Sequence, residues 1–175
     1  MASPLYVARN GTYEEFCEVF DAENNDSTTM LLGGLINRDA DARFRISNDM
    51  LDKGADPCAV EEGQNTLSLL LGGHDHLSEG DCELVKRLVG GGADVNFRNG
   101  QGALVLRLAI VIRADDDEKR RPIYEALFGS ADLDLDLPNN ERNPVNTVGK
   151  WLRMNVDGRP GKLDVLDEFL KTKGY

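Results

Sequence analysis

The tripeptide His74-Asp75-His76 is the part of the sequence whose residue types come closest to a metal site. Two imidazoles and a carboxylate could hold zinc, which takes four ligands through nitrogen, sulfur or oxygen. Only Glu79 and Asp81 are near enough in the sequence to complete such a set. We therefore interpret residues 74–80 as a solvated loop and expect no bound metal.

Cys82 is the cysteine nearest to these histidines, and a cysteine beside an imidazole can act as a nucleophile. Its place at the start of an expected helix, on the apolar side, favours a structural role. The three cysteines, Cys17, Cys58 and Cys82, are odd in number and form no CxxC pair. This spacing argues against disulfides and zinc knuckles, and it predicts reduced thiols in a cytoplasmic protein.

Neither the acidic run at residues 115–118 nor the glycine-rich stretches match an ion-binding or phosphate-binding motif. The acidic run lacks the alternating oxygen ligands and the central glycine of a calcium loop. Gly72-Gly73 and residues 90–92 lack the Lys-Ser/Thr of a phosphate cradle. The sequence therefore predicts no catalytic residue, no cofactor and no enzyme activity.

The chain of 175 residues is acidic, with 31 Asp and Glu against 20 Lys and Arg and a formal net charge of −11. Nucleic-acid binding is disfavoured because phosphate contacts need clustered basic side chains. The longest apolar stretches, near residues 67–71 and 104–112, are too short to cross a bilayer. The opening residues also lack the basic start and apolar run of a signal peptide. We expect one cytoplasmic domain that binds neither nucleic acid nor membranes.

A short sequence pattern recurs along the chain, and it predicts the helices that would carry the residues discussed above. Residues 84–96 combine an apolar helical stripe with a stop at Gly92 and the sequence Ala-Asp-Val-Asn, and related phrases occupy residues 50–57 and 123–134. The Ala-Asp pairs begin at residues 55, 93 and 131, so the step is 38 residues both times. A fixed step of this size is typical of an array of stacked units.

Each unit is expected to hold a helix, a break, a second helix, a stop and a polar turn. Ser3 and Thr12 are expected to cap the first two helices, with Glu15 completing a capping box. Asp81 is expected to cap the helix that ends at Gly92, and the last helix should run from Leu163 to about Thr172. Equivalent apolar positions in the opening helices are Leu31, Leu67, Leu106 and Val145.

These phrases resemble the ankyrin repeat, which opens with G-x-T-P-L-H-x-A-A and closes with L-V/L-x-x-L-L-x-x-G-A-D-V/P-N. Residues 3–8 and 143–148 are similar to the opening phrase, and residues 84–96 are close to the closing one. The resemblance implies an all-α ankyrin-repeat solenoid of stacked helix–turn–helix units, with about four full repeats and a shortened N-terminal one. The units would span residues 3–26, 27–60, 61–99, 100–138 and 139–175. Inserts at residues 74–80, 114–121 and 155–161 depart from the family pattern, and their role stays open.

The resemblance also implies a binding surface, because in that family the turn after each Gly-Ala-Asp projects as a finger. Fingers and first helices together form a concave face that holds a protein partner. The fingers here would be Cys58–Glu62, Phe97–Gln101 and Leu135–Asn140. Aromatic and arginine side chains are common interface anchors, although any finger residue could equally be a plain turn residue. The candidate partner-binding residues are Glu61, Glu62, Phe97, Arg98, Asn99, Asp134 and Asp136.

Three functions remain open at this stage. The first is a monomeric, non-catalytic protein–protein interaction module that binds another protein, for example a basic one. The second is an inhibitor or immunity-type protein that neutralises a basic enzyme or toxin, which the acidic N-terminal half suggests. The third, an enzyme using the region from His74 to Cys82, is the least favoured because catalytic groups are scarce.

Overall fold

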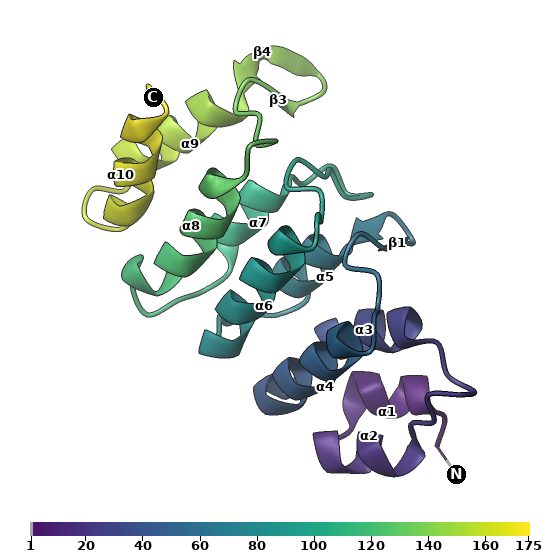
Figure 1. Ribbon diagram of the computed structural model, residues 1–175. Coiled ribbons are helices and arrows are strands. Elements are labelled where there is room, and N and C mark those ends of the chain that lie inside the picture. The colour runs from purple at the N-terminus through teal and green to yellow at the C-terminus, as the bar shows by residue number, and fades with distance from the viewer. Residues whose placement is uncertain (1) are drawn as a thin grey trace.

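The computed structural model describes residues 2–175, which form a row of five helix pairs. Figure 1 shows the N-terminal pair at the lower right and the C-terminal pair at the upper left. Each of the five expected sequence ranges holds one pair. The pairs are α1 (Pro4–Asn10) with α2 (Tyr13–Val19), α3 (Ser27–Leu35) with α4 (Ala40–Asp52), α5 (Thr66–Gly72) with α6 (Glu79–Gly90), α7 (Val105–Val111) with α8 (Arg121–Gly129), and α9 (Val148–Asp157) with α10 (Asp164–Thr172). A short 3-10 helix, η1 (Glu118–Arg120), precedes α8.

The prediction of an all-α ankyrin-repeat solenoid is wrong, because the chain also forms two antiparallel two-stranded sheets. One sheet pairs β1 (Val60–Glu61) with β2 (Gln64–Asn65), and the other pairs β3 (Pro138–Asn140) with β4 (Asn143–Thr147). About 53% of the chain is helical, so the fold is mixed α and β. The first hairpin forms because Glu62 and Gly63 both have positive φ, 49° and 74°, which matches a two-residue hairpin turn. The sequence argument treated this stretch as an irregular turn.

The helices form two layers with a continuous core between them. In the first-helix layer, α1 contacts α3, α3 contacts α5, and α5 contacts α7; in the second-helix layer, α2, α4, α6, α8 and α10 contact one another in the same order. Leucines dominate the fully buried side chains, and the largest is Tyr124 of α8. Because no short helix pair can bury its apolar stripe alone, each pair depends on its neighbours for its core. Within the described chain, no helix is both long and apolar enough to cross a membrane.

Several predicted helix ends are confirmed, and one is wrong. Ser3 caps α1, and Thr12 with Glu15 forms the capping box of α2. Gly92, just beyond α6, has a φ of 97°, which suits the left-handed C-terminal position. Asp81, however, does not cap α6: Ser78 does, and Asp81 is the third helical residue, which completes the box.

The expected opening of the last unit at residues 143–148 is also wrong. Residues 143–147 form strand β4, and Val145 is 74% exposed instead of buried. α9 starts only at Val148, with Thr147 as its cap. This register places Gly149 where α5 has Leu67, and the ring of Tyr175 lies against Gly149 in the space that a side chain would fill. In the last unit, the ring of Tyr175 therefore fills the space that the side chain of Leu67 fills in the unit of α5.

A buried ion pair connects α4 to α6. Arg43 donates from Nε to Asp81 Oδ1 at 2.6 Å and from Nη2 to Oδ2 at 2.9 Å, with the two side chains 3% and 1% exposed. Arg43 Nη1 also donates to the carbonyl of Asn37 at 2.7 Å, and the backbone N–H of Ser78 donates to Asp81 at 2.8 Å. Both charges are therefore paired and hydrogen-bonded, as burial requires.

We predict that Asp81→Leu lowers the free energy of unfolding by about 3–5 kcal/mol, because it leaves the guanidinium buried without a partner. Urea denaturation followed by far-ultraviolet circular dichroism measures this loss. The double variant Arg43→Met/Asp81→Leu should recover part of the loss, since it removes both charges. A double-mutant cycle with a coupling energy near zero would contradict this account of the pair.

Candidate functional site

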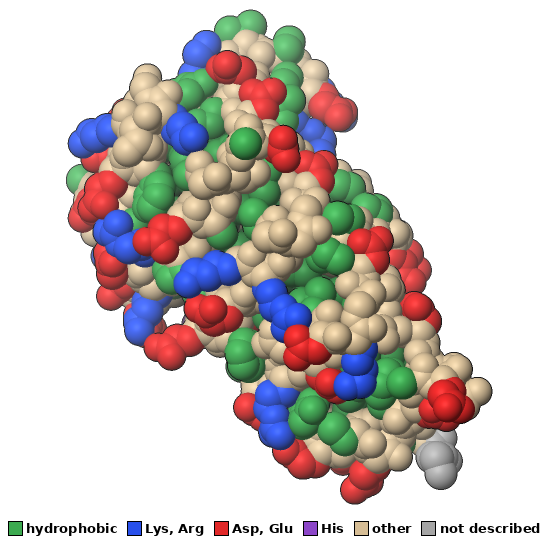
Figure 2. Space-filling view, in the orientation of Figure 1, with side chains coloured by type: hydrophobic (Ala, Val, Ile, Leu, Met, Phe, Trp, Pro, Cys, Tyr) green, Lys and Arg blue, Asp and Glu red, His purple; other side chains and the backbone are tan. Residues whose placement is uncertain are grey.

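The turns that precede α5, α7 and α9 form one acidic edge of the molecule. We call residues 56–65, 94–104 and 132–147 the finger edge. Figure 2 shows Asp and Glu side chains along the right-hand edge of the view, where β1 and the β3–β4 hairpin lie. The only basic residues in these ranges are Arg98 and Arg142. Seven exposed carboxylates of the finger edge form no ion pair within residues 2–175: Asp56, Glu61, Glu62, Asp94, Asp132, Asp134 and Asp136.

Hydrogen bonds between successive turns hold this edge in one arrangement. The N–H of Gly100 donates to the carbonyl of Gly63 at 2.8 Å, which joins the first turn to the second. Asn96 joins the second to the third: its Nδ2 donates to the carbonyl of Asp132 at 2.6 Å, and its Oδ1 accepts from the N–H of Asp134 at 2.9 Å. An edge fixed in this way loses little conformational entropy when a partner binds.

The four acidic candidates from the sequence all lie exposed on this edge. Glu61 and Glu62 occupy the β1–β2 hairpin, and Asp134 and Asp136 occupy the turn before β3. Asp136 accepts a hydrogen bond of 2.6 Å from the hydroxyl of Tyr175, and this bond to the carboxylate raises the pKa of the tyrosine. The expectation of an acidic finger surface remains a prediction about binding, but the charges do lie on one edge.

The other three candidates mainly hold the edge together. Arg98 is half-buried and donates to the carbonyls of Pro138 and Asn139, the latter at 3.2 Å, so it bridges the second and third turns. Asn99 is buried, and its Oδ1 accepts from two N–H groups of its own turn. Phe97 is half-buried against the core. These placements give Arg98 and Asn99 positioning roles within the edge.

Three further carboxylates of the same edge were not among the candidates predicted from the sequence: Asp56, Asp94 and Asp132. Each is the aspartate of a repeated Ala-Asp pair, so its periodic spacing was a usable signal. Asp56 and Asp94 each accept a hydrogen bond of 2.8 Å from the N–H two residues later, which is an Asx turn. The geometry that shapes these two turns therefore also fixes the charges of Asp56 and Asp94.

The first-helix layer borders this edge and is poor in acidic residues. Its five helices hold a single acid, Asp157, which pairs with Arg153 at 3.0 Å. Their basic residues are Arg9, Arg107, Lys150 and Arg153. The second-helix layer holds most of the other helical acids, among them Glu14, Glu15 and Glu18 on α2. Although the whole chain has a net charge of −11, its first-helix layer is therefore weakly basic.

Apolar side chains are exposed on this same layer. Tyr6 of α1, Val111 of α7 and Met154 of α9 are 62%, 62% and 64% exposed. On the two C-terminal helices of the layer, Arg107 lies over the ring of Trp151, with 5.6 Å from Cζ to the ring centroid. Aromatic, methionine and arginine side chains of this kind are enriched in protein interfaces.

His74 lies in the loop between α5 and α6, as the sequence suggested, but its half-buried ring caps a helix end. Its Nε2 lies 2.7 Å from the carbonyl of Leu35 at the end of α3, and the ring is half-buried. Because a carbonyl can only accept, Nε2 carries the proton. Burial lowers the pKa of His74. In the part of the chain that the structure describes, no group of three or more His, Cys, Asp or Glu could hold a metal ion.

Cys82 is buried, and its Sγ lies 3.5 Å from the carbonyl of Lys119. Burial raises the pKa of this thiol to about 11, with the negative charge of Asp81 acting in the same direction. The thiol form therefore dominates at neutral pH, which is the opposite of what a nucleophilic cysteine needs. Cys17 and Cys58 are free and exposed.

We predict that a disulfide reagent at pH 8 modifies two thiols quickly and the third only after unfolding. With a pKa of about 11, Cys82 is about one-thousandth thiolate at that pH. The absorbance of the released thiolate, followed with and without urea, measures both phases. The variant Cys82→Ser should lose the slow phase alone, and three equally fast thiols in the folded protein would contradict the prediction.

We predict that the His74 ring stabilises the fold less as the pH falls below about 6.5, its ordinary pKa in the unfolded chain. Since burial lowers the pKa of the folded state, the unfolded chain binds more protons in this range. Glutamine keeps an N–H donor but does not titrate, so His74→Gln is the matched variant. The difference in free energy of unfolding between the two proteins should shrink from pH 7.5 to pH 5. A difference that stays constant or grows would refute this role of burial.

Comparisons with known proteins define the fold but no function. No protein-family profile matches the sequence, and no curated protein matches it. The structure is similar to the crystal structure of a functionally unknown protein from Leptotrichia buccalis C-1013-b, with a TM-score of 0.75 and 23% sequence identity. The match covers 99% of this chain and 95% of that chain, so the two share the whole fold. Neither comparison indicates the ankyrin family, and that resemblance stays a prediction.

Proposed function

We propose that this protein is a non-catalytic protein-binding module that holds another protein against its finger edge and first-helix layer. The observation that carries the proposal is the rigid row of unpaired, exposed carboxylates, Asp56 to Asp136, beside a layer with exposed apolar side chains. Fixed charges set the on-rate and the choice of partner, whereas apolar and aromatic contacts supply most of the affinity.

A partner that fits both surfaces carries Lys or Arg toward the finger edge. It presents apolar side chains toward Trp151, Val111 and Met154. Clustered phosphates would be repelled by the finger edge, so a nucleic acid does not fit. The protein acts as a monomer in this proposal, since a second copy would bring the same acidic edge.

Catalysis is not part of the proposal. The only two imidazoles of the chain are His74, which caps a helix end, and His76, and the nearby thiol of Cys82 is kept protonated by burial. A buried, protonated thiol and a capping histidine are both poor candidates for nucleophile and base. The three free cysteines fit a reducing compartment, and we place the protein in the cytoplasm.

An inhibitor or immunity-type protein is the second candidate, and the finger edge favours it as well. A basic enzyme or toxin could be covered by a row of carboxylates that is already fixed in place. The two candidates differ in what happens to the partner. An inhibitor abolishes the activity of its partner on binding, whereas a passive binding module leaves that activity unchanged.

We predict that reversing two charges of the finger edge, Glu62→Lys with Asp134→Lys, reduces partner recovery at least about tenfold, because each change replaces attraction by repulsion. Affinity capture from the source lysate, quantified by mass spectrometry against wild type, measures the loss. Raising the salt concentration should weaken wild-type capture in the same direction.

The matched control is Glu18→Lys with Glu125→Lys, which changes the net charge equally on α2 and α8, away from the finger edge. Its capture should stay within about twofold of wild type, since distant exposed charges are screened. If both double variants lost the partner equally, net charge and not the finger edge would explain binding. If neither lost it, the finger edge would have no part in recognition.

A further inference from the structure

An apolar groove lies at the opposite ends of the helices from the finger edge. Its volume is about 670 Å³, and it lies between the first turns of α4, α6 and α8. Phe44, Gly80, Cys82 and Pro122 form its apolar floor. We call this cavity the insert groove, because residues 74–80 and 114–121, two segments that lengthen their units, build its walls. Its size is in the range of small-molecule and peptide pockets.

Contacts within the protein fix the shape of the insert groove. The N–H of Leu77 donates to the carbonyl of Arg113 at 2.8 Å, and the N–H of Arg113 donates to the carbonyl of Asp75 at 3.1 Å, so the first insert is hydrogen-bonded to the residue just before the second. Gly80 lets α4 approach closely, since a Cβ at this position would come within 2.9 Å of the Phe44 ring. The groove is therefore built into the fold.

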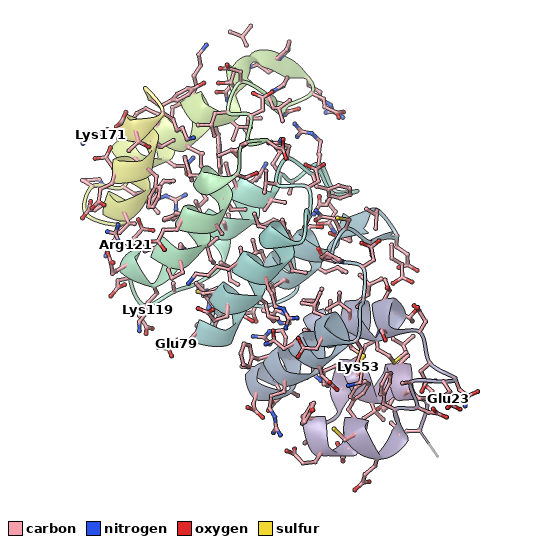
Figure 3. The ribbon with its side chains drawn as sticks, in the orientation of Figure 1. Glu23, Lys53, Glu79, Lys119, Arg121 and Lys171 are labelled. Atoms are coloured by element: carbon pink, nitrogen blue, oxygen red, sulfur yellow. The ribbon has the colours of Figure 1, made fainter. Side chains whose placement is uncertain are left out.

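The rim of the insert groove is acidic. Asp41, Glu79, Glu83 and Glu118 line it, against one cation, Lys119. Figure 3 shows Glu79 and Lys119 next to each other at the α6 and α8 ends, where their side chains are 3.8 Å apart. Both residues also line a smaller adjoining cavity that contains Asp115, so this pair stands between the two.

The rim carboxylates remain open to an incoming cation. Asp41 and Glu83 each have a basic neighbour on their own helix, and both of these pairs are exposed, whereas Glu118 accepts through both oxygens from the half-buried Arg121. Exposed ion pairs contribute little to stability, so a guanidinium or ammonium group from a partner can replace or join them. Glu79 is 94% exposed and lies beyond the usual distance of a strong ion pair from Lys119.

We propose that the insert groove is a second docking site, and that it takes a protein segment with an aromatic or aliphatic side chain flanked by Lys or Arg. The apolar residue enters the space above Phe44 and Pro122, and the flanking cations meet Glu79 and Glu83. Charge complementarity selects this occupant: a second copy of this chain, with its net charge of −11, is repelled. The C-terminal segment of the same chain, which contains two lysines and Tyr175, is already seated on Gly149.

This site is independent of the proposed finger-edge function. α6 has 12 residues and runs from the insert groove toward the finger edge, so it separates the two surfaces by about 18 Å. One partner can reach both surfaces only if it is extended, and two partners can bind at once. The experiment must therefore report on each surface separately.

The test uses a displayed library of random peptides of about twelve residues, selected on the wild-type protein. The variant Ala40→Trp serves for counter-selection, because Ala40 is exposed on the rim and a tryptophan there fills the groove. We expect the enriched sequences to place an apolar residue between basic ones. Their binding, measured by fluorescence anisotropy of the synthetic peptide, should weaken at least about tenfold in Ala40→Trp and in Glu79→Lys/Glu83→Lys.

Three matched variants should bind the same peptide within about twofold of wild type. Ala131→Trp places an indole on the finger edge side, Glu18→Lys/Glu125→Lys changes the net charge equally, and Glu62→Lys/Asp134→Lys alters the finger edge. Peptides without basic residues, equal binding to Ala40→Trp, or no saturable binding would overturn the proposal. A concentration-dependent dimer that Ala40→Trp abolishes would overturn it in favour of self-association. Loss in the finger-edge variant alone would assign the peptides to that surface.

Discussion

The whole row of helix pairs depends on how the polar groups at the helix ends are satisfied. The carbonyls at the end of a first helix have no partner inside that helix, and in the core they cannot reach water. Side chains from later in the chain supply the missing donors. Asn37 donates to the carbonyls of Ala8 and Gly11, each at 2.9 Å, and Arg120 donates to that of Ile112 at 2.6 Å. The bonds from Asn37 join the second helix pair to the first, whereas the bond from Arg120 joins the two helices of its own pair.

The need to satisfy polar groups at helix ends also explains why some charged side chains are buried. Asp117 is buried, accepts from the hydroxyl of Tyr124 at 2.8 Å, and accepts from the N–H of Leu166 at 2.9 Å, so it caps α10 from another unit. Burial and this nearby carboxylate raise the pKa of the tyrosine. Arg43 and Asp81 serve α4 and α6 in a comparable way, so Asp81 and Asp117 are both buried where one helix pair meets the next. The remaining acids lie in the second-helix layer, the finger edge and the other connecting loops, and the first-helix layer holds one acid, Asp157.

Features set by a few neighbouring residues could be predicted from the sequence. The caps of α1 and α2 and the left-handed glycine after α6 depend on residues within one turn, and these predictions are confirmed. Features set by distant residues could not. By residue type, both Ser78 and Asp81 could cap α6. Asp81 forms an ion pair with Arg43, 38 residues away, and only this contact decides that Ser78 is the cap and Asp81 lies inside the helix. In the candidate site, the acidic side chains could be predicted from composition and spacing. The bridging role of Arg98 could not, because it depends on the carbonyls of Pro138 and Asn139, 40 and 41 residues further along the chain.

The two proposed surfaces lie at opposite ends of the second helices, and this arrangement follows from chain geometry. A connection that joins a first helix to its second helix lies at one end of the pair, and a connection to the next unit lies at the other. Turns between units are joined to their neighbours through backbone groups and the side chain of Asn96, although the three ranges of the finger edge differ in length. The inserts at residues 74–80 and 114–121 join the two helices of their own units and line the insert groove at the other end. The finger edge and the insert groove are therefore separated by the length of the second helices, and this geometry gives one chain room for both of the proposed docking surfaces.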